Sequence, residues 1–111
     1  MKKNENDVLS LYVNALQGIT IAASMMTLSI LCNDIKKDWP EFKKLMNSYY
    51  EFDNFNREDC HNKNNHSDKT LKSGKIFLQE IKKFKSNLDA QDKDIQDIIE
   101  NTIETTQLFI S

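Results

Sequence analysis

The chain has few of the residues that build turns, and this shortage excludes most β folds. Only two Gly and one Pro occur in 111 residues, whereas a hairpin-rich domain needs a turn residue about every 8–12 positions. The chain has a single Arg, Arg57, which leaves little capacity for reading base edges in nucleic acid. A net charge of −2 and a pI near 5.6 give no bulk attraction to nucleic acid or to an anionic membrane.

Charge is missing from one long segment near the N-terminus. From Val8 to Asn33 no side chain is charged, although 29% of the chain is. A helix of that length spans about 39 Å, enough to cross a hydrocarbon core of about 30 Å. Asn14 and Gln17 interrupt the segment, and few of its residues insert strongly into lipid. We therefore predict a soluble helix rather than a membrane span, with a membrane anchor over residues 8–32 as the alternative.

Apolar residues cover both sides of this predicted helix. One stripe repeats at steps of three and four residues: Leu9, Tyr12, Leu16, Ile19, Ala23, Met26 and Ile30. The opposite side is also apolar: Ile21, Met25, Leu28 and Cys32. A helix that is apolar all round is buried all round, so the segment is predicted to be the core helix. On this interpretation Ala23→Asp would bury an unpaired charge and prevent folding.

Apolar periodicity predicts three further helices. The second begins near Pro40, the third at Ser67 or Asp68, and the fourth at Asp89, while residues 54–67 lose periodicity and are predicted to form a polar loop. A chain of 111 residues has room for one core. Short connections place successive helices antiparallel. The prediction is an all-α, single-domain antiparallel bundle of about four helices over residues 1–111, with the apolar first helix at its core.

Few side chains in the sequence could bind a metal ion, form a disulfide or act as a catalytic nucleophile. Cys60, His61 and His66 have metal-ligand chemistry, but their spacing matches no structural zinc module, so no metal or other cofactor is expected. No secretion signal favours a Cys32–Cys60 disulfide, so both thiols are predicted to be reduced, as in the cytoplasm. No Ser or Cys has the base or the Gly-rich turn that nucleophilic catalysis needs. We therefore expect no enzymatic activity.

Charge in the second half of the chain is segregated. Residues 67–86 carry a local charge of +4 and residues 87–111 one of −5. The simplest interpretation is that two antiparallel helices complement each other across a hairpin, in exposed pairs each worth less than about 1 kcal/mol. The alternative is a partner-binding surface on the last helix, made of Asp94, Asp97, Glu100 and Glu104. A second predicted partner-binding group surrounds the aromatic end of the second helix and the loop, with Tyr50 as an aromatic anchor and four acids: Glu51, Asp53, Glu58 and Asp59.

An acidic surface with aromatic anchors fits a cationic target such as the active cleft of a nuclease. In size and helical character the chain resembles bacteriocin and contact-dependent toxin immunity proteins, which implies an inhibitor that occludes a cognate toxin. Lys, Asn and Ile make up a third of the chain, as is common in AT-rich bacterial genomes. One alternative is a helical adaptor or chaperone of a secretion or phage-encoded system, including a homodimer assembled through the first helix. Another is a membrane-associated helper anchored by residues 8–32.

Overall fold

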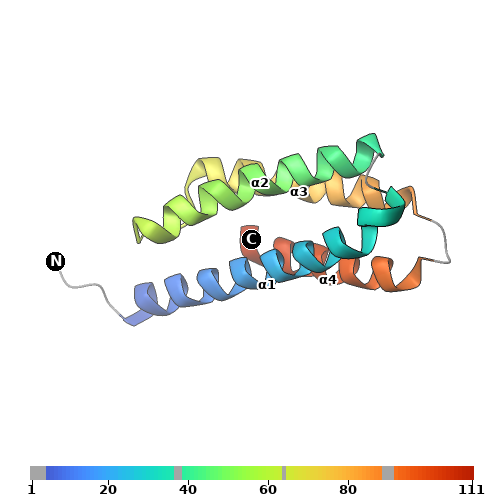
Figure 1. The fold of residues 1–111 in the computed structure, drawn as a ribbon. Helices are drawn as coiled ribbons and strands as arrows, with labels where there is room; N and C mark the ends of the chain where they lie inside the picture. The colour runs from blue at the N-terminus through green and yellow to red at the C-terminus, as the bar shows by residue number, and fades with distance from the viewer. Residues whose placement is uncertain (1–4, 37–38, 64, 89–91) are drawn as a thin grey trace.

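Four α-helices make up the part of the chain described by the computed structural model, which is residues 5–36, 39–63, 65–88 and 92–111. They are α1 (Glu5–Lys36), α2 (Pro40–His61), α3 (Asp68–Ser86) and α4 (Lys93–Ile110). Successive helices run antiparallel in a molecule 53 Å long and 21 by 20 Å across (Figure 1). The predicted all-α bundle of about four helices is confirmed.

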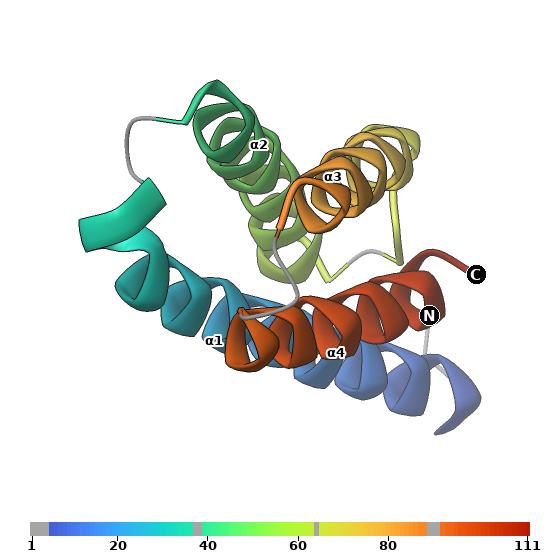
Figure 2. The same ribbon diagram turned by 90° about the vertical axis from the view of Figure 1, so that its right-hand side faces the viewer.

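The helices form two layers, with α1 beside α4 and α2 beside α3 (Figure 2). Packing is most extensive between α2 and α3 and between α1 and α4, and α3 packs on α4 to join the layers. The backbones of α1 and α2 make the fewest contacts of any neighbouring pair. Over the described residues α1 lies diagonally opposite α3, and α2 lies diagonally opposite α4. The bundle is therefore least closed between α1 and α2.

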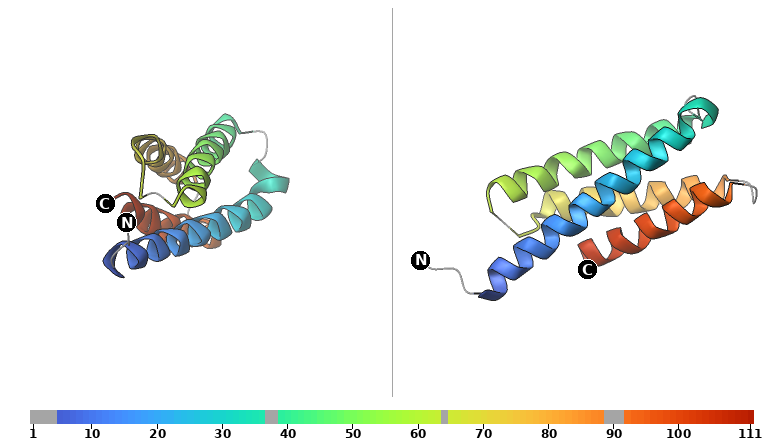
Figure 3. Two further views of the ribbon diagram at one scale, coloured as in Figure 1. Left: turned by 90° about the vertical axis from the view of Figure 1, so that its left-hand side faces the viewer. Right: turned by 60° about the horizontal axis from the view of Figure 1, so that its bottom comes forward.

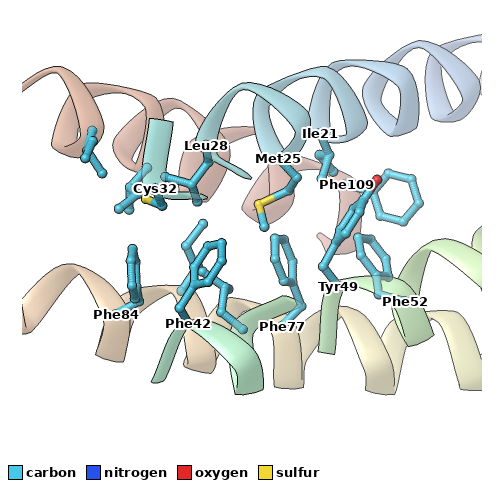
Figure 4. Close-up of a cluster of buried hydrophobic side chains, with 14 residues drawn as sticks. Ile21, Met25, Leu28, Cys32, Phe42, Tyr49, Phe52, Phe77, Phe84 and Phe109 are labelled. Carbon is cyan, nitrogen blue, oxygen red and sulfur yellow. The ribbon is translucent and has the colours of Figure 1, made fainter. Parts of the chain in front are cut away.

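The core is built from aromatic rings. Phe77 of α3 lies against Tyr49 and Phe52 of α2, with ring centroids 5.6 and 5.7 Å away, and Phe52 meets Phe109 of α4 edge-on at 5.2 Å. From the other layer, α1 turns four buried side chains toward these rings (Figure 4): Ile21, Met25, Leu28 and Cys32. Three of the helices contribute rings, and α1 closes the core with smaller side chains.

Local chemistry explains where the helices begin. Pro40 occupies the first turn of α2, where its missing N–H leaves no hydrogen bond unmade. Ser67 caps α3 as predicted, because its hydroxyl accepts a hydrogen bond from the Thr70 N–H at 3.3 Å. The predicted start of the last helix at Asp89 lies outside the described residues, and α4 is observed from Lys93.

The loop predicted over residues 54–67 is shorter than expected, because α2 continues to His61. The buried face of α2 extends past Phe52 through Asn56 and Asp59 at helical spacing. Two of these three residues are polar, so a search for apolar periodicity ends the helix too early. The prediction was wrong for residues 54–61.

The prediction that α1 is buried on all sides is also wrong. Its inner side is buried, but the stripe that includes Leu9, Ile19 and Ala23 is exposed. The physical reason is geometric: a helix at the corner of a two-layer bundle has neighbours on one side alone. In the right-hand view of Figure 3 no other helix lies in front of α1. Ala23→Asp would therefore place its charge in solvent rather than in the core.

Candidate functional site

In the described part of the chain, two of the three side chains with metal-ligand chemistry, Cys60 and His66, line one hollow of about 120 Å³ between α1 and the end of α2. Cys60 and His61 are exposed, and His66 is half-buried against the Phe109 ring at a centroid distance of 3.9 Å. Within the described ranges no group of three His, Cys, Asp or Glu side chains could hold a metal ion. Burial and the neighbouring Asp59 raise the pKa of the Cys60 thiol, which disfavours the nucleophilic thiolate.

The two cysteines lie at opposite ends of the bundle. Cys60 lines a cavity with Ala15, in the first half of α1, whereas Cys32 lies 17 residues further along that helix, about 26 Å away. Neither thiol is in a disulfide: Cys32 is buried in the core and Cys60 is exposed. A disulfide between them would need a rearrangement of the whole fold, since bridged Cα atoms lie within about 7 Å of each other.

Asp59 belongs to the structural framework rather than to an exposed acidic surface. Its side chain is 6% exposed, and its Oδ2 accepts hydrogen bonds from the Thr70 hydroxyl at 2.6 Å and the Ser67 N–H at 3.0 Å. These bonds connect the end of α2 to the start of α3, where the helix dipole favours a negative charge. The predicted place of Asp59 on a partner-binding surface is therefore wrong.

The rest of that acidic group is divided between two sides of α2. Glu51 and Glu58 are exposed on the outer side, whereas Asp53 is half-buried and binds Arg57 through a 2.8 Å ion pair. Tyr50, which is 55% exposed, lines the same hollow toward α1 as Asp53 and Arg57. Because α2 lies diagonally opposite α4, none of these residues adjoins the acids of α4.

The acids of α4 are exposed as predicted. Most of them form no ion pair with the lysines of α3 that the structure describes. In the described part of the chain one ion pair joins α3 to α4, between Lys85 Nζ and Glu100 Oε1 at 3.0 Å. Asp94, Asp97 and Glu104 form no ion pair with any described residue. The lysine-rich α3 thus neutralises little of the acidic surface, despite lying beside it.

Leu108 is an exposed apolar residue beside the acids of α4 that the sequence analysis did not predict as part of the partner-binding surface. It is 64% exposed on the outer side of α4, where it follows Asp94 and Asn101 at intervals of seven residues. That spacing places the three residues on one flank of the helix, turned away from the α3 flank that carries Glu100. The signal was present in the sequence, since Leu108 lies out of phase with Ile95, Ile99 and Phe109.

Most of the large apolar side chains that are exposed in the described part of the chain belong to α1. Among the side chains of this helix that the structure describes, nine large apolar ones are 40–69% exposed: Val8, Leu9, Tyr12, Val13, Leu16, Ile19, Met26, Ile30 and Leu31. Val8–Cys32 is long and apolar enough to cross a membrane, with a mean hydropathy of 1.6, and 22% of its most apolar stretch is buried. Contiguous apolar patches of this kind mark contact sites for proteins or lipid.

Hollows lie between α1 and α2, where the bundle is least closed. Where the helices cross, a Cβ on Gly18 would lie 2.6 Å from Asn56 Nδ2, so glycine allows the close approach. One hollow of about 310 Å³ lies between Met26 and Ile30 of α1 and Tyr50 of α2. Another of about 380 Å³ is lined by Ile19 of α1 and by the Asp53–Arg57 pair.

No family model, curated protein or solved structure matches this chain. Its function must therefore be inferred from its own surfaces, namely the acidic outer side of α4 and the apolar outer side of α1.

His66 should make the fold sensitive to mild acid. Burial lowers the pKa of its imidazole from the ordinary 6.5, although a hydrogen bond to the Phe109 backbone and the charge of Asp59 act in the opposite direction. The unfolded chain then binds a proton at a higher pH than the folded chain does, so stability is complete above about pH 6.5 and falls as the pH drops toward the lowered pKa. We expect the melting temperature to decrease over this window. His66→Gln should remove the decrease and His61→Gln should preserve it; equal behaviour of the two variants would contradict the assignment.

Proposed function

We propose that this protein is a non-enzymatic inhibitor that binds a cationic protein, as a bacterial immunity protein binds its cognate toxin in the cytoplasm. The observation that supports the proposal is the outer side of α4, where Asp94, Asp97 and Glu104 lack ion-pair partners among the described residues and Leu108 is exposed beside them. Acids that serve only to complement α3 would be paired with its lysines.

The outer side of α4 combines carboxylates that can attract a cationic protein with an apolar side chain, Leu108, that can anchor it. Unpaired carboxylates at helical spacing create a negative potential that attracts a cationic cleft and speeds association. The basic side chains of α3 lie on the neighbouring helix, so the molecule has oppositely charged sides that orient it during the encounter. Leu108 can then lose its water against an apolar part of the partner, which slows dissociation.

The test begins with the genes adjacent to the one that encodes this chain. Each neighbour is expressed alone and together with this chain in a bacterial host, and we expect one product to arrest growth and co-expression to restore it. Binding of the purified pair should weaken as salt rises from about 50 to about 500 mM, chiefly through slower association. Asp94→Lys with Asp97→Lys should abolish protection while leaving the circular dichroism unchanged.

A matched control changes the net charge by the same amount on another face. Glu51→Lys with Glu58→Lys places the same reversals on the outer side of α2, diagonally opposite α4, and should leave protection intact. Protection that survives reversal of Asp94 and Asp97 would refute the proposal. Affinity that does not change with salt would instead favour an adaptor that binds through apolar contacts.

A further inference from the structure

Two buried polar atoms at the same end of the bundle lack a hydrogen-bond partner. They are Asn56 Oδ1 and His66 Nε2, and no described residue supplies a partner for either atom. Asn56 lies on α2 and is 8% exposed, and His66 lies in the connection from α2 to α3. Both residues line the hollow of about 120 Å³ between α1 and the end of α2, which we name the amide–imidazole hollow. Buried polar atoms without a partner are unfavourable, so the hollow favours a ligand that can bond to them.

Both atoms accept hydrogen bonds rather than donate them. The imidazole of His66 bonds to the backbone of Phe109, and because this bond raises the pKa, the imidazole is the donor in it. The unpartnered nitrogen is Nε2, so Nδ1 carries the donated proton and Nε2 of the neutral ring keeps a lone pair. The amide of Asn56 points its Nδ2 end at Gly18, where a Cβ would lie 2.6 Å away. Its carbonyl oxygen lies at the other end of the amide, so a ligand of the hollow must bring the donors.

The charges around the hollow favour a cation. The carboxylate of Asp59 lines it from a position that is 6% exposed. Its Oδ2 already accepts hydrogen bonds from Ser67 and Thr70, so Asp59 acts on a ligand mainly through its charge. Lys63 also lines the hollow but is exposed, and solvent screens an exposed charge more than a buried one. The C-terminal turns of α2 form one wall, and the C-terminal end of a helix carries a partial negative charge.

The size and the apolar wall of the hollow limit the ligand further. A volume of about 120 Å³ is roughly four times the share of one liquid water, which leaves room for about four non-hydrogen atoms. Leu11 and Ala15, one turn apart on α1, provide an apolar wall. We propose that the hollow binds a primary alkylammonium group, which donates to Asn56 Oδ1 and His66 Nε2 and lays its methylenes on that wall. The acids of α4 take no part, so this proposal is independent of the proposed inhibitory function.

Titration of the full chain with n-propylammonium tests the class of ligand. At about pH 7.5 this amine is protonated and an ordinary histidine is neutral. Nuclear magnetic resonance should show shifts of the Asn56 side-chain amide and of His66 Nε2, with a dissociation constant on the order of 1 mM for so small a ligand. Because the ammonium donates to the lone pair that a proton would take, saturation should also lower the pKa of His66.

Two analogues of n-propylammonium separate its charge from its donors. The alcohol 1-propanol has a donor without the charge, and propyltrimethylammonium has the charge without an N–H. Each should bind at least about 10-fold more weakly, because it lacks one of the two features that the hollow recognises. Equal binding of either analogue would overturn the proposal, and so would the absence of any shift at about 50 mM n-propylammonium, far above the expected dissociation constant.

A matched pair of substitutions locates the site. Asn56→Leu removes one acceptor and should weaken binding at least about 10-fold, whereas Asn54→Leu makes the same change at an exposed position of α2 outside the hollow and should bind as the wild type does. His66→Phe removes the other acceptor and provides a second test, with circular dichroism showing that each variant is folded. Undiminished binding by the folded His66→Phe variant would contradict the assignment.

A primary alkylammonium group can come from a free amine or from a lysine side chain of another protein. N-acetyl-lysine methylamide distinguishes these sources, because it carries the group on a peptide backbone. Affinity at least equal to that of n-propylammonium would identify a lysine side chain as the ligand. Much weaker affinity, with n-propylammonium still bound, would identify a free short amine.

Discussion

Replacing Phe77 by alanine is expected to lower the free energy of unfolding by about 3–5 kcal/mol. Phe77 is fully buried, and its ring contacts Tyr49 and Phe52 of α2, so truncation leaves a cavity where α2 and α3 pack most closely. The loss is a large part of the roughly 5–15 kcal/mol that stabilises a domain of this kind. Urea unfolding followed by circular dichroism measures it.

The control for Phe77 is its neighbour in the chain. Ile76 is 51% exposed on the same helix, so Ile76→Ala removes apolar atoms without opening a cavity and should change stability much less. If the two substitutions had equal effects, Phe77 would not lie in the centre of the core.

Asp59→Ala is expected to destabilise the fold by about 2–3 kcal/mol, because hydrogen bonds to a charged group contribute more than neutral ones. The substitution leaves the Ser67 N–H and the Thr70 hydroxyl without their shared acceptor, at the point where α2 connects to α3. Thermal and urea unfolding at neutral pH measure the change. Thr70→Val should lower the free energy of unfolding less in the Asp59→Ala background than in the wild-type chain, because the Thr70 hydroxyl has already lost the carboxylate that accepts its hydrogen bond.

Glu58→Ala is the matched control, since Glu58 is the exposed carboxylate next to Asp59 in the chain. It should leave the unfolding curve nearly unchanged. Equal loss in the Glu58 and Asp59 variants would show that net charge, rather than the hydrogen bonds of Asp59, stabilises this end of the bundle.

The end of α2 shows why a polar residue can be misassigned from sequence. Asp59 was grouped with Glu58 because both are acidic and adjacent, yet one is buried and the other exposed. Helical phase distinguishes them once the helix is known to continue to His61. The decisive contact is with Ser67 and Thr70, which belong to the next helix, and local periodicity carries no information about such a partner.

The acids of α4 show the opposite case. Asp94, Asp97, Glu100 and Glu104 are out of phase with Ile95 and Ile99, so their exposure followed from helical geometry alone. How many of these acids pair with lysines of α3 did not follow from the sequence, because it depends on which flank of α4 meets α3. One ion pair, Lys85–Glu100, joins the two helices in the described part of the chain, although the sequence places six lysines on the neighbouring helix.

By itself the sequence determined that this protein is a helical bundle, because few turn residues and repeated apolar spacing leave no other way to bury its side chains. It also determined that α1 has two apolar sides. Only the tertiary structure decided which side is covered: Met25 and Leu28 are fully buried, whereas Met26 and Ile30 are exposed. Both sides have the same spacing and similar hydrophobicity, so the choice depends on how three other helices, distant in sequence, fit together around one core.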